Sequence, residues 1–273
     1  MLKDITLGQY FPGDSPLHKL DPRVKLVLTI FYIVIIFIAK GAAGFLVITL
    51  FTLALIMLSK IPFSVIMRGL KPLIFIIAFT AVINVFWTTG EKPLVNFGFI
   101  KIYYEGILYA VLMVLRVVLL LLGTSVLLTY TTSPIALTDG IERLLGPLKK
   151  IKMPVHEFAM MMTIALRFIP TLIEETDKIM NAQKARGVDF TTGGLLQRAK
   201  ALIPILIPLF VSAFRRADEL AVAMECRCYR GGEGRTRMTI LRLAPRDFVA
   251  VGTFALFCAV VVATNIYVPW LTI

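Results

Sequence analysis

The sequence is poor in the residues that catalysis and metal binding require. It contains two histidines far apart in the chain, three cysteines, and no phosphate-binding loop of the form G-x-x-x-x-G-K-[ST]. The glycine-rich stretch at 231–236 lacks the lysine and a preceding strand. So few histidines and cysteines do not form a credible metal site or disulfide framework. We therefore expect no catalytic residue, no bound metal and no cofactor in this chain.

Charge is scarce as well. Only 17% of residues are charged, 58% are hydrophobic and the mean hydropathy is +0.84, whereas a soluble domain has about 25% charged residues. The charge-free runs cover residues 72–89, 117–137 and 248–273, and residues 24–59 form an apolar stretch divided at 40–44. Because about 20 apolar residues cross a bilayer, the sequence predicts an all-α polytopic membrane protein with about five spans.

Basic residues in short loops predict the orientation of these spans. Residues 1–23 have no apolar core or cleavage site of a secretory signal. The loop at 60–71 carries Lys60, Arg68 and Lys71 and no acidic residue, which is typical of the cytosolic side. We expect a multi-pass protein of the cell membrane with a cytosolic N-terminus and, after five spans, a C-terminus outside.

A basic region follows the first membrane spans. Residues 131–247 contain 18 Lys and Arg against 12 Asp and Glu and no long uncharged run. This excess favours contact with the anionic surface of the lipid bilayer, and no module or aromatic platform indicates nucleic-acid binding. We predict helices at 134–145, 155–186 and 194–229. The predicted organisation is an N-terminal membrane domain (1–133, about four spans), a cytosolic coupling-helix domain (134–243) and a final span (244–273).

The two longer helices end in related motifs. Residues 182–187, AQKARG, recur 41 positions later as residues 223–228, AMECRC. Each copy carries one arginine, Arg186 or Arg227, near the end of its helix. A cation in the last turn also complements the helix dipole, so either arginine alone has a purely structural explanation. Repetition at matched spacing favours docking of two similar tips into two similar receptors.

Two stretches resemble a known family, the transmembrane coupling subunit (T component) of energy-coupling factor transporters. These are vitamin and metal importers of the ATP-binding cassette class. The first stretch is residues 8–25, GQYFPGDSPLHKLDPRVK, and the second is the pair of arginine motifs. Ala185–Arg186–Gly187 matches the family motif fully. The second copy has Cys226 and Cys228 in place of alanine and glycine but retains Arg227. The resemblance covers essentially the whole chain.

The resemblance implies a non-catalytic scaffold with defined partners. These would be two cytosolic ABC-type ATPase subunits, which bind ATP and Mg, and one small, interchangeable substrate-binding membrane subunit. Each motif arginine would enter a groove of one ATPase. The ATPase-coupling residues would be Ala182, Ala185, Arg186, Gly187, Ala223, Glu225, Cys226, Arg227, Cys228 and Tyr229.

Methionine is concentrated in the same region. Seven of eleven methionines lie between residues 153 and 238, where they could fill gaps in a helical core or form an adaptable docking surface. Within the resemblance, the residues that would face the substrate-binding subunit are Met160, Met161, Met162, Phe210 and Phe214.

Two other functions remain open. A membrane-embedded lipid or polyprenyl transferase could use Glu174, Glu175, Asp177 and Asp189 as metal ligands, but no paired acidic motif supports it. A self-sufficient secondary transporter is disfavoured because the predicted spans carry few polar residues and no acidic residue for ion coupling.

Overall fold

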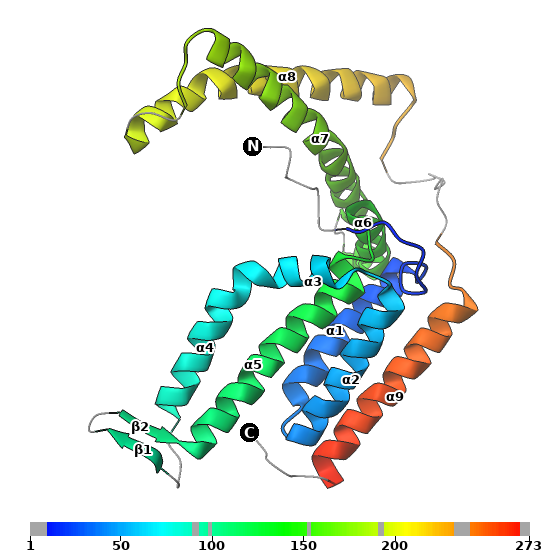
Figure 1. The fold of residues 1–273 in the computed structure, drawn as a ribbon. Coiled ribbons are helices and arrows are strands. Elements are labelled where there is room, and N and C mark those ends of the chain that lie inside the picture. Colours follow the sequence, from blue (N-terminus) through cyan, green and yellow to red (C-terminus); the bar gives the residue numbers. More distant parts are fainter. Residues whose placement is uncertain are drawn as a thin grey trace. The chain divides into compact units, whose positions relative to one another are not determined.

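A computed structural model describes residues 10–88, 93–97, 100–151, 154–190, 194–231 and 241–267 (Figure 1). The chain divides into two compact units. The membrane unit comprises Gly8–Ile141 and Leu241–Ile273, and the coupling unit contains Glu142–Ile240.

The membrane unit is a helical bundle with one small hairpin. Its helices are α1 (Pro22–Ile38), α2 (Ala42–Ser59), α3 (Phe63–Leu70), α4 (Ile74–Trp87), α5 (Tyr104–Thr124) and α9 (Pro245–Tyr267). A 3-10 turn, η1 (Lys71–Leu73), precedes α4, and a π-helical turn, η2 (Ser125–Thr129), extends α5. Strands β1 (Pro93–Phe97) and β2 (Ile100–Tyr103) pair antiparallel, with Phe97 opposite Ile100.

The coupling unit is built from two long helices. Helix α6 (Pro134–Leu144) crosses the boundary between the units, and the 3-10 turn η3 (Gly146–Ile151) follows it. Helix α7 (Val155–Ala185) has 31 residues and α8 (Leu195–Cys226) has 32. Both helices continue through their interior prolines, which are Pro170 in α7 and Pro204 and Pro208 in α8.

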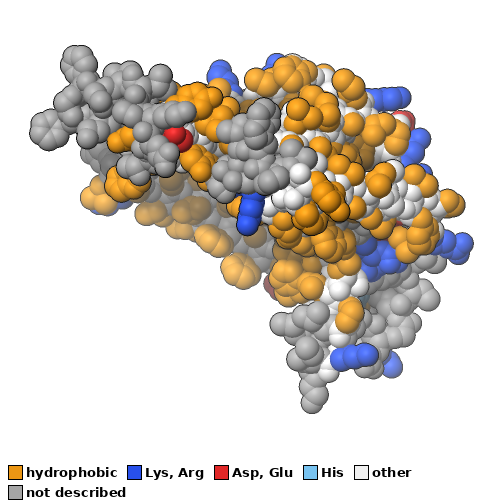
Figure 2. Space-filling model, turned by 90° about the horizontal axis from the view of Figure 1, so that it is seen from below, with side chains coloured by type: hydrophobic (Ala, Val, Ile, Leu, Met, Phe, Trp, Pro, Cys, Tyr) orange, Lys and Arg blue, Asp and Glu red, His pale blue; other side chains and the backbone are white. Residues whose placement is uncertain are grey.

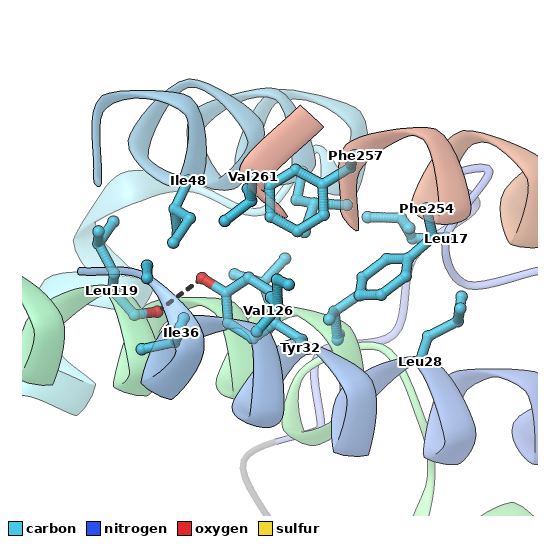
Figure 3. Close-up of a cluster of buried hydrophobic side chains, with 14 of the residues drawn as sticks. Leu17, Leu28, Tyr32, Ile36, Ile48, Leu119, Val126, Phe254, Phe257 and Val261 are labelled. Atoms are coloured by element: carbon cyan, nitrogen blue, oxygen red, sulfur yellow. Dashed lines mark hydrogen bonds between the residues drawn. The ribbon is translucent and has the colours of Figure 1, made fainter. Parts of the chain in front are cut away.

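The core of the membrane unit forms around Tyr32 of α1 (Figure 3). This side chain is fully buried, and its hydroxyl donates to the carbonyl of Leu119 (2.9 Å) and lies 2.7 Å from the hydroxyl of Thr52. The ring occupies space that opens only because residue 123 is glycine, since a Cβ at Gly123 would overlap it. Tyr32 therefore ties α1 to both α2 and α5, and satisfying its hydroxyl avoids the cost of a buried unpaired polar group.

The segment that carries the family resemblance closes one end of this bundle, which we call the polar end. Asp21 caps α1, and its backbone N–H donates to Oδ1 of the buried Asp247 (2.9 Å). Lys25, also buried, donates from Nζ to the carbonyl of Thr131 (2.7 Å). The backbone N–H of Phe11 donates to the carbonyl of Tyr130 (3.0 Å). Residues of the 8–25 segment thus join the starts of α1 and α9 to the end of α5.

The opposite end of the bundle is held by two polar side chains. Asn265 of α9 donates to the carbonyl of Ile38 (2.9 Å) and accepts from the backbone N–H of Lys40 (3.2 Å). Arg116 of α5 donates to the carbonyl of Ala39 (2.9 Å). Both contacts satisfy backbone groups at the turn between α1 and α2, which a helix end otherwise leaves unpaired.

The predicted all-α polytopic class is confirmed, and the hairpin β1–β2 is an addition that the sequence analysis missed. Five described helices have the length and composition of membrane spans: Ala42–Ser59, Phe63–Trp87, Tyr104–Thr129, Val155–Ala185 and Pro245–Tyr267. Hydrophobic side chains accordingly dominate the face seen in Figure 2.

The count of five agrees with the prediction, but the members differ. Helix α1, which we counted as a span, has 17 residues and is not among them. Helix α7 qualifies instead, although its mean hydropathy of 1.2 is the lowest of the five. Length and composition do not separate α7 from the spans, so the placement of residues 134–243 outside the membrane stays a prediction.

The predicted span at 117–137 is wrong at both ends. The helix starts at Tyr104, directly after β2, and its π-turn ends at Thr129. Arg116 therefore lies inside the span, where its guanidinium contacts the Ala39 carbonyl and lies 5.2 Å from the Phe45 ring centroid. The absence of charge did not mark the helix boundary, because protein contacts accommodate this arginine.

Candidate coupling site

Helices α7 and α8 pack against each other as an antiparallel, crossing pair (Figure 1). An ion pair between Glu175 Oε2 and Arg216 Nη2 (3.0 Å) joins the two helices. Towards the end of α7, the Gln183 side chain donates weakly to the carbonyl of Pro204 (3.5 Å). At the other end of the pair, Thr163 of α7 and Met224 of α8 line a common cavity.

These contacts share the 41-residue spacing of the sequence repeat. Glu175 and Arg216, which pair with each other, are themselves 41 positions apart. Adding 41 to Gln183 gives Met224, and subtracting 41 from Pro204 gives Thr163. The 41-residue shift therefore relates the Gln183–Pro204 contact at one end of the pair to the neighbouring residues Met224 and Thr163 at the other end. The α7–α8 pair therefore has an approximate internal twofold relation centred near Glu175 and Arg216.

The twofold relation places the two motif arginines at equivalent positions. Arg186 follows Glu175 by 11 residues, and Arg227 follows Arg216 by 11 residues. At a rise of 1.5 Å per residue, each arginine lies about 16 Å along its helix beyond the ion pair. Because the helices are antiparallel, the arginines occupy opposite ends of the pair.

The end of α7 is a Schellman cap. The N–H of Gly187 donates to the carbonyl of Lys184 (2.9 Å), and the N–H of Val188 donates to the carbonyl of Gln183 (3.1 Å). Gly187 has a φ of +88°, the left-handed conformation that this motif needs and that glycine adopts without steric cost. Arg186 occupies the C-cap position itself.

The end of α8 has the same cap with a different residue. The N–H of Cys228 donates to the carbonyl of Glu225 (2.8 Å), and the N–H of Tyr229 donates to that of Met224 (3.1 Å). Cys228 adopts a φ of +55° where the first copy has glycine, and Arg227 is at the C-cap. The cysteine thus preserves the cap geometry despite the departure from the family motif. The predicted helix end at residue 229 is three residues late because this turn wraps back on the helix.

Both arginines are exposed and available. Within the part of the chain that the structure describes, neither guanidinium makes an ion pair or a hydrogen bond. Lys184 adds a second positive charge in the last turn of α7, and Arg230 lies just beyond Arg227. The dipole at the C-terminal end of each helix favours these cations. That interaction does not use the hydrogen-bond donors of the two guanidinium groups, which stay available for a partner.

A cavity of about 570 Å³ adjoins the second tip. Arg227, Cys228 and Tyr229 line one side of it, and Met160 and Ile164 of α7 line the other. Tyr229 is half-buried, whereas the flanking predicted residues are exposed: Ala182, Ala185, Ala223, Glu225 and Cys226.

The residues predicted to face a substrate-binding subunit do not form one patch. Phe210 and Phe214 are 59% and 68% exposed on α8, and Met161 and Met162 are 58% and 40% exposed on α7. Met160 is half-buried in the cavity beside Arg227. Antiparallel packing separates the methionines, near the start of α7, from the two phenylalanines near the middle of α8.

A longer apolar surface lies on α8. It consists of exposed residues around the two phenylalanines: Leu202, Ile203, Leu206, Ile207, Phe210, Val211 and Phe214. We call it the α8 stripe. Of the run at 201–214, only Ile205 is buried within this chain.

The acidic residues of the transferase hypothesis do not assemble a metal site in the described structure. Glu175 is engaged by Arg216. Among the described residues, no three His, Cys, Asp or Glu side chains lie together in an arrangement that could hold a metal ion.

Comparison with known proteins identifies the class of molecule as the membrane subunit of a transporter. Residues 13–240 match the family of cobalt transport proteins. The chain is 60% identical over 251 residues to the energy-coupling factor transporter transmembrane protein EcfT of Clostridium kluyveri, covering 92% of this chain and 93% of that protein. It is 51% identical over 247 residues to EcfT of Bacillus subtilis, covering 90% and 93%. The EcfT of Lactococcus lactis is 49% identical over 269 residues, with 98% of each chain covered.

These matches extend across both units of the structure. The chain belongs to the EcfT family, the transmembrane components of energy-coupling factor transporters, and is therefore a multi-pass membrane subunit of a transporter complex.

Proposed function

We propose that this chain is the scaffold that couples two cytosolic ABC-type ATPase subunits to a small substrate-binding membrane subunit, in an importer of vitamins or other micronutrients. The observation that carries this proposal is the internal twofold relation of the α7–α8 pair. It presents Arg186 and Arg227 as exposed C-cap residues at equivalent positions on opposite ends. Two similar arginine-bearing helix ends are suited to bind two similar ATPase subunits.

Arginine suits such a tip chemically. Its planar guanidinium donates several hydrogen bonds at fixed geometry to carboxylates or to carbonyl groups at helix ends. The Schellman caps fix the backbone at each arginine, so less conformational freedom is lost when the side chain enters a groove. Binding of ATP and Mg belongs to the ATPase subunits, and this chain contributes no catalytic residue and binds no cofactor itself.

The α8 stripe is the surface proposed to meet the substrate-binding subunit. Exposed apolar side chains contiguous over several helical turns mark protein or membrane interfaces. An apolar contact without fixed hydrogen-bond partners tolerates exchange of one partner for another, and the exposed Met161 and Met162 are adaptable in the same way. Substrate choice then lies in the interchangeable subunit. In this arrangement the N-terminus is cytosolic, on the side of Lys60, Arg68 and Lys71.

The test is recovery of the ATPases with variants of the two tips. Arg186→Glu and Arg227→Glu should each impair ATPase pull-down and vitamin uptake, and the double variant should nearly abolish both. Loss of one partner of a buried, hydrogen-bonded charge pair costs on the order of 2–5 kcal/mol, which is about a 30-fold or greater loss of affinity. Arg215→Glu is the matched control, because Arg215 is exposed on α8 but lies 12 residues before the tip.

A purely structural role for the arginines predicts a different result. Loss of a favourable dipole interaction would lower stability by about 0.3–1 kcal/mol and leave ATPase binding intact. Normal ATPase recovery and uptake by a well-expressed double variant would therefore contradict the proposal. Metal-dependent turnover of a lipid or polyprenyl substrate by the purified chain alone would favour the transferase instead.

A further inference from the structure

A second cavity lies within the membrane unit, at its polar end. It has a volume of about 770 Å³, within the range of about 300–1,000 Å³ that is usual for small-molecule sites. The N-terminal segment, α1, α2 and α9 all contribute to its lining. Its wall is apolar and formed mainly by Leu28, Phe51, Leu55, Leu58, Ala250 and Phe254.

Four basic residues line this cavity, and three of them, from separate elements, have exposed side chains beside the apolar wall. Lys19 comes from the N-terminal segment, Lys60 follows the end of α2, and Arg246 is in the first turn of α9. All three are exposed. Asp14 is the one acidic residue in the lining, and its carboxylate lies 3.9 Å from Lys19 Nζ. Lys60 and Arg246 form no ion pair with any described residue.

The backbone at Lys60 is unusual for a lysine. Lys60 is the C-cap of α2 and adopts a φ of +55°, in the left-handed region. Residues other than glycine and asparagine rarely occupy this region, at a cost of roughly 1–2 kcal/mol. Lys60 thus places a positive charge at the cavity, in a backbone conformation that glycine would adopt more easily. Lys25, by contrast, is buried and directs its ammonium to the carbonyl of Thr131, so it belongs to the fold.

The apolar wall continues onto surfaces of membrane-spanning helices. Leu58 of α2 is 51% exposed and Val249 of α9 is 65% exposed, and both line the cavity. Hydrophobic side chains on these two spans face outward beyond the cavity, among them Leu53 and Leu256. The cavity therefore joins an apolar path along α2 and α9 to a cluster of positive charge at the helix ends.

We propose that this cavity binds one anionic phospholipid from the leaflet at the polar end of the bundle. Its phosphate would lie among Lys19, Lys60 and Arg246, and an acyl chain would lie against Phe51, Leu55 and Phe254. The two halves of the site match the two halves of such a lipid. A soluble phosphate would use only the basic rim, and a zwitterionic lipid would bring a cation to a rim that is already positive.

The test measures which lipid contacts the cavity in the intact chain. Leu58→Trp places a fluorescent probe in the wall, in a background with Trp87→Phe and Trp270→Phe. The variant is reconstituted in vesicles of phosphatidylcholine and phosphatidylglycerol, with bromine on the acyl chains of one lipid at a time. We expect brominated phosphatidylglycerol to quench the probe several-fold more effectively than its mole fraction predicts. The matched probe Phe75→Trp, on α4, should show no such preference.

Neutralisation of the rim identifies the cause of the preference. Each basic side chain near an anionic lipid contributes up to about a fivefold preference, so Lys19→Gln, Lys60→Gln and Arg246→Gln should each reduce it and the triple variant should remove it. Arg68→Gln with Lys71→Gln removes two basic residues of α3 and η1 that do not line the cavity. That control should retain the preference of the Leu58→Trp probe.

Four results would overturn the proposal. The first is equal quenching of the probe by the two brominated lipids, and the second is a preference that survives in the triple variant. The third is loss of quenching when inorganic phosphate is added, which would identify a soluble anion as the occupant. Protection of the probe from both lipids would likewise contradict it, because protein would then fill the cavity. Quenching of the Phe75→Trp probe verifies that each variant is inserted.

Discussion

The matched caps of α7 and α8 predict opposite effects for two simple substitutions. Gly187 and Cys228 both have positive φ, at +88° and +55°, but only glycine adopts that conformation freely. A left-handed L-residue costs roughly 1–2 kcal/mol. No atom lies within 4 Å of a Cβ built on Gly187, so backbone strain alone should set the cost there. We expect Gly187→Ala to destabilise the first cap by about 1 kcal/mol and Cys228→Gly to stabilise the second by a similar amount.

Hydrogen exchange measured by mass spectrometry can report on each cap separately. The amides of Val188 and Tyr229 donate the hydrogen bonds that close the two caps, and local opening controls their exchange. A change of about 1 kcal/mol corresponds to roughly a fivefold change in the opening equilibrium. Exchange at Val188 should therefore be about fivefold faster in Gly187→Ala, and exchange at Tyr229 about fivefold slower in Cys228→Gly.

The control for both variants is a glycine in an ordinary helical position. Gly252 lies inside α9, and no atom lies within 4 Å of a Cβ built on it. Gly252→Ala should stabilise α9 by roughly 1 kcal/mol and leave exchange at both tips unchanged. Equal and same-sign changes in the two cap variants would refute the reasoning, as would faster exchange at Tyr229 in Cys228→Gly.

Two further predictions concern packing within each unit. Gly123→Ala would force a methyl group into the Tyr32 ring, and we expect it to lower the free energy of unfolding by about 1–3 kcal/mol or more, measured by thermal unfolding in detergent; an unchanged midpoint would contradict the observed packing. Glu175→Gln and Arg216→Gln should each cost less than about 1 kcal/mol, because the pair is about one-third exposed. The double variant should cost no more than either single variant, and strictly additive losses would show that the pair contributes no coupling energy.

Much of the helical framework was predictable because local signals mark it. The break between α1 and α2 lies at residues 39–41, overlapping the expected 40–44, and α7 begins at Val155 as predicted. Interior prolines did not end either long helix. The start of α5 was missed because we took a charge-free run as the span, although Arg116 can be accommodated by the carbonyl of Ala39. Contacts of that kind are long-range and leave no trace in hydropathy.

The candidate site was only partly predictable. The repeat located Arg186 and Arg227, but their placement on opposite ends of one pair depends on how α7 and α8 pack. A signal for this packing was present in the sequence, since Glu175 and Arg216 carry opposite charges at the same 41-residue offset. The alignment of the two motifs was interpreted only as evidence that the two helices are alike, and the possibility that they contact each other was not considered. Opposite charges at equivalent positions instead indicate that the two copies contact each other there.

The internal twofold relation also explains why the two tips can differ in sequence and still act alike. The position of Gly187 and Cys228 controls the backbone of the cap, and both residues reach the same left-handed conformation. The arginines precede that position and remain exposed in both copies. Each lies 11 residues beyond the Glu175–Arg216 ion pair, so a displacement applied at either tip acts over an equal length of helix. Under the proposed function, two ATPases that move together would therefore transmit their motion to the crossing symmetrically.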